Sequence, residues 1–146
     1  IGYSVSNGIE LFIEYKNGEY SYKTSSNTNT EQMSKEVQTG TDSTGKPIIK
    51  VFNFTKTTTT IEEVGTIHYL LSMRGSYYSN NINNDVTVRN TVKNVKYTGD
   101  VPPNSDYRDS ESKPLGSYEI EKKTIEKLKK EVNYNIDSMV NDLKRI

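Results

Sequence analysis

The chain has 146 residues, of which 32% are apolar, and its 19 basic side chains balance its 19 acidic side chains. A chain of this length is enough for one domain, and its neutral charge argues against the basic surface that nucleic-acid-binding proteins usually carry. Because the chain has no cysteine, it has no disulfide bond, thiolate nucleophile or cysteine-bound metal, and none of its apolar runs approaches the roughly 20 residues of a membrane-spanning helix.

Residues 9–24 have the pattern of a β-hairpin. Between Ile9 and Tyr15, every second residue is apolar, as in a strand with one buried face. Asn17-Gly18 follows, and this dipeptide is the strongest short signal for the two-residue turn of a hairpin. Such a turn would place Tyr15 opposite Tyr20. A helix over residues 9–15 is the competing interpretation.

Residues 25–47 are dominated by Ser, Thr, Asn and Gly, which indicates a mobile loop. Within it, Thr30 is expected to cap a single helical turn. A loop of this length is unusual inside a compact domain, and such loops are often functional or disordered.

Two strands are predicted next, at residues 48–60 and 66–78. The first is rich in β-branched and aromatic residues, and the second alternates apolar with polar side chains. Glu62, Glu63 and Gly65 are expected at the connection between the two strands.

The asparagine-rich residues 80–84 indicate a turn, and a strand from Val86 to Tyr97 follows. The apolar positions of this strand change from even-numbered to odd-numbered residues. That change predicts a bulge or a bend near Lys93-Asn94.

The C-terminal part of the chain reads as a connector and a long helix. Residues 99–116 hold three of the four prolines and are predicted to run extended over the surface. From residue 117 to residue 146 the pattern is helical, with Ser117 expected as the cap and Glu119 expected to pair with Lys123. The apolar positions recur in steps of three and four and form one narrow stripe. They are Ile125, Leu128, Val132, Ile136, Met139, Val140, Leu143 and Ile146.

These elements predict an α+β fold, in which an antiparallel sheet of four to five strands has one long C-terminal helix packed on a face. Along the sequence, this single domain divides into a strand-rich body (residues 1–98), a proline-containing connector (99–116) and the helix (117–146). At about 1.5 Å per residue, the helix would be as long as a compact domain of this size. It therefore either crosses the whole sheet or extends to pack on another subunit.

Few side chains offer acid–base or metal chemistry. His68 is the only histidine, and a surface position on its strand explains it more simply than a role as general base. A single histidine without cysteine also argues against a zinc site.

Carboxylates are the remaining route to catalysis. In a strand, the adjacent Glu62 and Glu63 would point to opposite faces, whereas a glycosidase needs two acids facing each other across a bond. Asp106, Asp109 and Glu111 lack the spacing of an EF-hand calcium loop.

Several basic residues of the predicted strands have tyrosines nearby in the sequence. A face that combined them would suit nucleic acid, but the solvated side of an antiparallel sheet is the simpler interpretation. The residues are Arg74, Arg89, Lys93 and Lys96, with Tyr77, Tyr78 and Tyr97. Asn53-Phe54-Thr55 matches the glycosylation pattern, but it lies within a predicted strand and is interpreted as chance.

The sequence has no phosphate-binding glycine loop, dinucleotide fingerprint or nucleophile elbow, and no cofactor is expected. The polar loops, the 11 tyrosines and the long helix favour a non-catalytic interaction or assembly module in a surface, secretion or phage-type structure. A carboxylate-dependent hydrolase and a nucleic-acid-binding domain are the alternatives.

The expected partner is a protein, or a second copy bound through the C-terminal helix, and nucleic acid is not expected. The interaction surface is expected to comprise Leu128, Val132, Ile136, Met139, Leu143, Tyr77, Tyr78 and Tyr97. Because the chain opens on Ile1 rather than methionine, we expect it to be trimmed or processed. An extracytoplasmic or cell-surface location is favoured.

Overall fold

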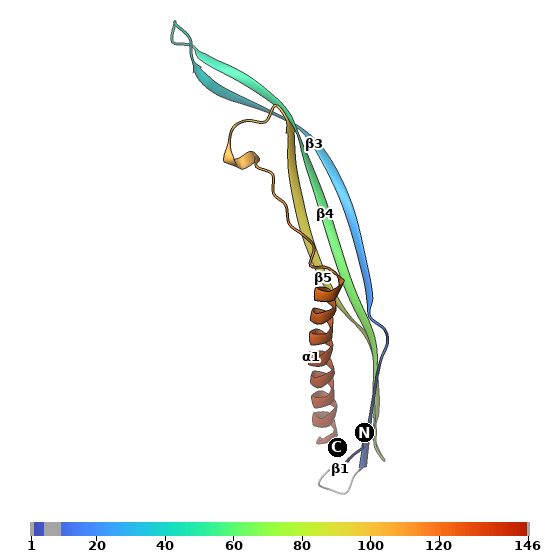
Figure 1. The fold of residues 1–146 in the computed structure, drawn as a ribbon. Coiled ribbons are helices and arrows are strands. Elements are labelled where there is room, and N and C mark those ends of the chain that lie inside the picture. Colours follow the sequence, from blue (N-terminus) through green and yellow to red (C-terminus); the bar gives the residue numbers. More distant parts are fainter. Residues whose placement is uncertain (1, 5–9, 146) are drawn as a thin grey trace. The chain divides into compact units, whose positions relative to one another are not determined.

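The computed structural model describes residues 2–4 and 10–145 and has an open antiparallel sheet and one C-terminal helix (Figure 1). The strand β4 is the centre of the sheet, because it pairs with β2, β3 and β5, while β1 pairs with β2. The predicted α+β fold is therefore confirmed. The elements are β1 (Gly2–Ser4), β2 (Glu10–Asn17), β3 (Ser21–Thr41), β4 (Pro47–Arg74), β5 (Ser79–Gly99), the 3-10 helix η1 (Ser105–Tyr107) and α1 (Ser117–Leu143).

By their contacts, the described residues form two compact units. Unit 1 draws on residues 1–23, 63–90 and 115–146, and unit 2 on residues 24–62 and 91–114. The strands β3, β4 and β5 each contribute residues to both units. The division into body, connector and helix along the sequence stays a prediction.

The two strands predicted at residues 48–60 and 66–78 are one continuous strand, β4. The predicted connection at Glu62 and Glu63 is therefore wrong. The β-branched run before these residues favours extended backbone, and nothing from residue 61 to 65 requires a turn. The covered positions of β4 are even-numbered at Phe52 and Phe54 and odd-numbered from Glu63 onward.

The predicted hairpin at residues 9–24 is wrong, and so is the competing helix. The strand β2 pairs antiparallel with β4, with Tyr15 opposite Leu71. The chain then passes Gly18, whose backbone N–H donates to the carbonyl of His68 at 2.8 Å, and continues along β4 as β3. Gly18 does not have the positive φ that a type I′ turn requires. A long neighbouring strand thus overrides the local turn signal.

The mobile loop predicted at residues 25–47 is also wrong, because most of it is strand β3. Its polar side chains hydrogen-bond to those of β4, with Thr28 and Thr59 oxygens 3.3 Å apart and the Thr55 hydroxyl donating to Gln32 Oε1 at 3.0 Å. Thr30 lies inside the strand and caps no helical turn. Composition suggested a loop because the apolar residues that mark a strand are few here.

The turn between β3 and β4 is built by Asp42. Its Oδ1 accepts hydrogen bonds from the backbone N–H groups of Thr44 at 2.8 Å and Lys46 at 2.9 Å. Gly45 has a φ of 82°, which glycine adopts readily. Local chemistry of this kind explains why the chain reverses here rather than earlier.

The strand β5 is longer than predicted, and the turn expected at residues 80–84 is wrong. The chain reverses at Gly75, whose N–H donates to the carbonyl of Tyr78 at 2.8 Å, and at the far end the Asp100 N–H donates to the Asn53 carbonyl at 3.2 Å. Between these two hydrogen-bonded pairs, β4 and β5 span the same number of residues. Neither strand therefore has a net insertion at Lys93-Asn94. The predicted bulge is therefore wrong, and the alternative of a bend at this point stays a prediction.

In unit 2, an aromatic cluster forms the covered side of the sheet. The ring of Phe54 lies 5.0 Å from that of Tyr107 and 6.1 Å from that of Tyr97. The connector holds Tyr107 there through η1 and pairs with β5 by two backbone hydrogen bonds between Val95 and Ser110, each 2.9 Å. The backbone is extended at Asn104 and Arg108, on either side of this single turn of 3-10 helix, and an extended course of the whole connector stays a prediction.

The predicted C-terminal helix is confirmed, although its start differs in detail. Gly116, with a φ of 91°, is the N-cap, so the prediction that Ser117 caps the helix is wrong. Glu119 pairs with Lys122, at 3.4 Å, three residues further on. The end predicted at residue 146 lies outside the described residues. Within them, the helix ends at Leu143.

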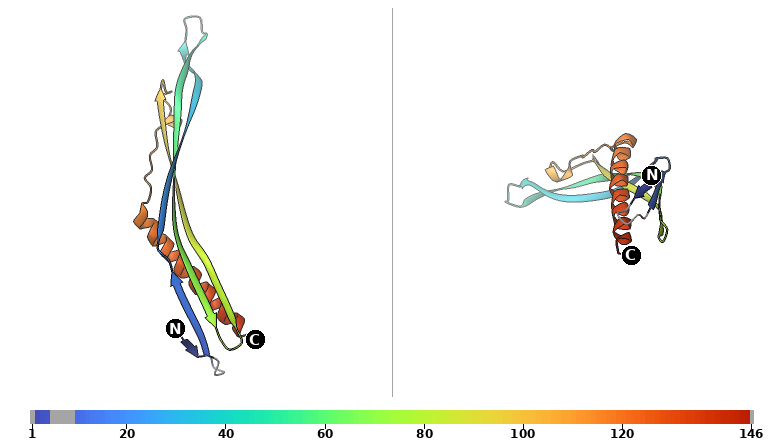
Figure 2. Two further views of the ribbon diagram at one scale, coloured as in Figure 1. Left: turned by 90° about the vertical axis from the view of Figure 1, so that its right-hand side faces the viewer. Right: turned by 90° about the horizontal axis from the view of Figure 1, so that it is seen from below.

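One face of α1 packs on the sheet within unit 1 (Figure 2). The residues that it buries include Ile120, Leu128 and Met139. They meet a core contributed by β2, β4 and β5, which comprises Ile13, Ile67, Tyr69, Leu71, Met73 and Val86. The apolar stripe of the helix therefore serves the chain's own core.

Gly65 sets how closely the helix approaches β4. A Cβ atom there would lie 2.5 Å from Ile120 Cγ2 and 2.7 Å from Thr124 Oγ1, so no side chain larger than hydrogen fits without a shift of these side chains or of the helix that carries them. Thr124 is fully buried, and its hydroxyl donates to the carbonyl of Ile120 at 2.7 Å.

We expect Gly65→Ala to lower the free energy of unfolding by about 1–3 kcal/mol, because the added methyl group overpacks the helix–strand contact. Urea unfolding followed by the helical circular dichroism signal measures the change. Gly40→Ala is the matched control, since a Cβ at Gly40 meets nothing within 4 Å. Equal stability of the two variants would contradict the tight contact.

Candidate functional site

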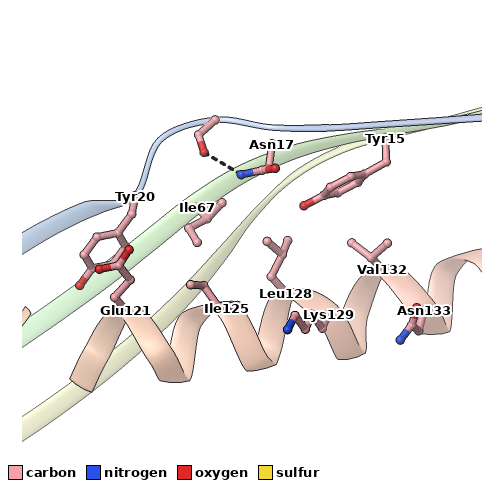
Figure 3. A pocket seen from close by; sticks show the side chains of 11 residues that line it. Tyr15, Asn17, Tyr20, Ile67, Glu121, Ile125, Leu128, Lys129, Val132 and Asn133 are labelled. Carbon is pink, nitrogen blue, oxygen red and sulfur yellow. Dashed lines mark hydrogen bonds between the residues drawn. The ribbon is translucent and has the colours of Figure 1, made fainter. Parts of the chain in front are cut away.

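A groove in unit 1, between β2 and α1, is the candidate site (Figure 3). Its volume is about 490 Å³. We call it the α1–β2 groove. It is lined by Tyr15, Asn17, Gly18, Tyr20, Ile67, Glu121, Ile125, Leu128, Lys129, Val132 and Asn133.

The floor and walls of the groove are mostly apolar. Ile67 and Leu128 are buried and form its base, while the side chains of Tyr15 and Val132 approach each other from opposite sides (Figure 3). Tyr15 remains 41% exposed, and its partial burial raises the pKa of its hydroxyl. A cavity of this kind accommodates apolar side chains.

Polar groups surround this apolar floor. Glu121 lies near Tyr20 at one end, and Lys129 and Asn133 follow along the helix (Figure 3). The Tyr20 hydroxyl donates to the carbonyl of Ser117 at 3.0 Å and so ties the end of the groove to the first turn of α1. A small number of polar groups placed around an apolar floor can fix the orientation of a bound molecule.

The residues predicted as an interaction surface are only partly brought together. Leu128 and Val132 line the groove. Met139 is buried in the core, and Ile136 and Leu143 are half-buried on α1. Of the tyrosines, Tyr77 is 91% exposed at the β4–β5 turn, Tyr78 packs against the core of unit 1, and Tyr97 belongs to unit 2.

Sequence reasoning missed the β2 side of the groove. Tyr15, Tyr20 and Ile67 were recognised as strand residues, but the hairpin prediction paired Tyr15 with Tyr20. In the structure, both line one groove that faces α1. The alternation within residues 9–15 contained the signal for the buried face, whereas the partner strand came from a distant part of the chain.

Glu63 is the most deeply buried charged residue of the described chain, with no solvent exposure. Its Oε1 accepts hydrogen bonds from the Tyr22 hydroxyl at 2.8 Å and the Gly116 N–H at 2.7 Å. Its Oε2 accepts from Asn90 Nδ2 and from the Leu115 N–H, both at 2.9 Å. The carboxylate thus joins three strands to the segment that starts α1.

These hydrogen bonds decide the protonation state of Glu63. Burial alone would raise its pKa, but the four donors, with Asn90 the strongest, outweigh burial and lower the pKa from 4.5 to about 2. The carboxylate also lies at the N-terminal end of α1, where the helix dipole favours negative charge. Glu63 is therefore held as a structural anion, with all its close partners contributed by the protein.

We expect Glu63→Gln to lower the free energy of unfolding near pH 7 by roughly 2–4 kcal/mol, because the amide nitrogen would face a hydrogen-bond donor in a buried site. The pKa of Glu63 is lower in the folded chain than in the unfolded chain. Its stabilisation is therefore complete above pH 4.5 and is lost as the pH falls towards 2. Urea unfolding at a series of pH values measures both effects.

The control for this variant is Glu126→Gln, which changes an exposed carboxylate of α1. We expect the control to keep the wild-type loss of stability between pH 4.5 and pH 2, and Glu63→Gln to show a shallower loss. Identical pH profiles for wild type and Glu63→Gln would rule out the carboxylate as a source of stability.

His68 lies at the surface, as predicted. Its Nδ1 is 2.6 Å from Asp85 Oδ1, and the side chains of the two residues are 55% and 60% exposed. On the adjacent rung, the hydroxyls of Thr66 and Thr87 are 3.4 Å apart. This is an exposed cross-strand pair rather than an enclosed catalytic arrangement.

The other carboxylates singled out from the sequence do not gather into a site. Asp109 accepts a hydrogen bond from the Tyr97 N–H at 2.7 Å and fastens the connector to β5, while Asp106 and Glu111 are exposed. Within the described ranges, no group of three or more His, Asp or Glu side chains is placed to hold a metal ion.

The basic residues of the strands are also dispersed. Arg74 and Arg89 belong to unit 1, and Lys93 and Lys96 to unit 2. Because successive side chains of a strand alternate between faces, Lys93 and Lys96 point to opposite sides of β5. Asn53-Phe54-Thr55 lies within β4, with Phe54 only 3% exposed.

No protein-family model matches the chain, and comparisons with curated proteins and with solved structures give no match. None of the helices formed by the described residues is long and apolar enough to cross a membrane. The fold and the geometry of the α1–β2 groove are therefore the basis for a functional proposal.

Proposed function

We propose that this chain is a non-catalytic interaction module that binds an apolar segment of a partner protein in the α1–β2 groove. The observation that carries the proposal is the groove itself, whose volume of about 490 Å³ is bounded by apolar and aromatic side chains and by a polar rim. Most protein recognition sites place apolar anchors of the partner in such a pocket and surround them with polar contacts.

The aromatic and charged residues that line the groove suit recognition of a polypeptide. Tyr15 and Tyr20 offer large contact surfaces with few rotatable bonds, so that binding costs little side-chain entropy. Lys129 and Glu121 carry opposite charges along the same side of the groove, which favours a partner of defined orientation.

The helix stripe contributes to this proposal through its groove-lining residues rather than as a whole. Met139 is 2% exposed and does not line the groove, so a second copy could reach it only if α1 left its own sheet, whereas Leu128, 6% exposed, forms the base of the groove. Val132, by contrast, is half-buried and accessible from the groove. An assembly role in a surface, secretion or phage-type structure is the wider setting that we propose for this binding.

To test the proposal, a phage-displayed library of random dodecapeptides is selected on the full chain. We expect peptides with apolar residues to be enriched and to bind the Ile125→Lys chain at least about tenfold more weakly, since a charge would then occupy the apolar wall of the groove. Fluorescence anisotropy of the synthetic peptides measures the affinities.

Tyr134→Lys is the control, because Tyr134 is 72% exposed on α1 and does not line the groove. It introduces the same charge on the same helix and should leave binding unchanged. A library that yields no binder, or binders indifferent to Ile125→Lys, would overturn the proposal, provided that circular dichroism shows both variants to be folded.

A further inference from the structure

We infer that the partner segment binds as an extended strand that adds to the outer edge of β2, antiparallel to it, and inserts two alternate apolar side chains into the α1–β2 groove. This inference rests on the proposed function and specifies its binding mode. Strand addition of this kind combines main-chain hydrogen bonds, which supply affinity, with pockets for alternate side chains, which supply specificity.

The backbone groups of β2 point alternately towards β4 and away from it. Gly18 donates its N–H to the carbonyl of His68 on β4, and in an antiparallel pair every second residue bonds to the same neighbour. The alternate residues of β2, which do not bond to β4, therefore turn their N–H and C=O groups towards the outer edge of β2. Tyr15 and Asn17 belong to this outward set, and both line the groove.

The outer edge of β2 already pairs with one strand. β1 pairs antiparallel with it, with Gly2 opposite Phe12 and Ser4 opposite Glu10. Among the described residues this pairing reaches Phe12, and opposite Tyr15 and Asn17 the described chain places no strand. A partner strand antiparallel to β2 would thus continue the sheet in line with β1.

The side chains of the added strand would alternate between the two faces of the sheet. Residues directly opposite each other in an antiparallel pair project to the same face of the sheet. The partner residues opposite Tyr15 and Asn17 would therefore point towards α1, between Leu128 and Val132. In the partner strand, the two inward-pointing residues are separated by one residue whose side chain faces away from α1. The expected partner motif is therefore an apolar residue, any residue, and a second apolar residue.

The rim indicates what precedes this motif. β2 and α1 run in opposite directions along the groove, with Glu121 near Tyr20 and Val132 near Tyr15 (Figure 3). A strand antiparallel to β2 would enter at the Glu121 end. A basic residue ahead of the two apolar residues would meet this carboxylate, so the partner chemistry is a basic residue followed by alternating apolar side chains.

The test uses the unaltered chain and three peptides of the sequence Lys-Thr-Val-Thr-Ile-Thr, acetylated and amidated. One peptide is unmodified, one is N-methylated at Val and Ile, and one is N-methylated at the two threonines that follow Val and Ile. In the inferred pairing, the residues that point into the groove are also those whose amides bond to β2. The two methylated peptides therefore differ only in which edge of the added strand they block.

We expect the unmodified and threonine-methylated peptides to bind with similar affinity, and the Val/Ile-methylated peptide to bind at least about tenfold more weakly because two main-chain hydrogen bonds are lost. Nuclear magnetic resonance titration of the labelled chain gives the affinities. The amide shifts of Tyr15 and Asn17 should change most.

The outcomes separate this inference from the proposed function. If Ile125→Lys abolishes binding but all three peptides bind the unaltered chain with equal affinity, strand addition is overturned and the groove is retained as the site. Equal weakening by both patterns also contradicts the inferred register. Failure of all three peptides to bind at millimolar concentration would overturn the strand mode, and the proposed function would then stand or fall by the library selection.

Discussion

The fold of unit 1 depends on a buried negative charge that is fully hydrogen-bonded. Glu63 has no contact with water, and an unpaired charge in such a position would be very unfavourable. Its four donors come from β3, β5 and the residues that start α1, so they satisfy the carboxylate only when these segments are assembled around β4. The charge therefore specifies the arrangement as well as stabilising it.

This anchoring determines where the helix lies. Leu115 and Gly116 donate to Glu63 immediately before α1 begins. Two residues further along β4, Gly65 admits Ile120 and Thr124 into close contact. Fixed at this end, α1 runs beside β2 with its apolar face towards Ile67 and Leu71. The α1–β2 groove exists because the helix leaves the half-buried side of β2 incompletely covered.

The sequence predicted those features that are encoded locally. The steps of three and four in residues 117–146 gave the helix, and the alternation after residue 66 gave the buried face of β4. The pairing partner of each strand was not predictable in the same way. Asn17-Gly18 is a strong turn signal, but here the long strand β4 competes with the local hairpin for pairing with β2. The burial of Glu63 was likewise hidden, since three of its four donors lie more than 40 residues away along the chain and the fourth, Asn90, lies 27 residues away.

The failed hairpin prediction and the proposed binding site have the same physical origin. If β2 had turned back at Asn17-Gly18 and paired with the following residues, those residues would have occupied its second edge. Instead, β2 and β3 follow one another along the same side of β4, so that, of the segments the structure describes, β1 alone pairs with part of this edge. The outward backbone groups of Tyr15 and Asn17, and the apolar space between them and α1, are therefore a direct consequence of a chain that does not turn where its local sequence indicates.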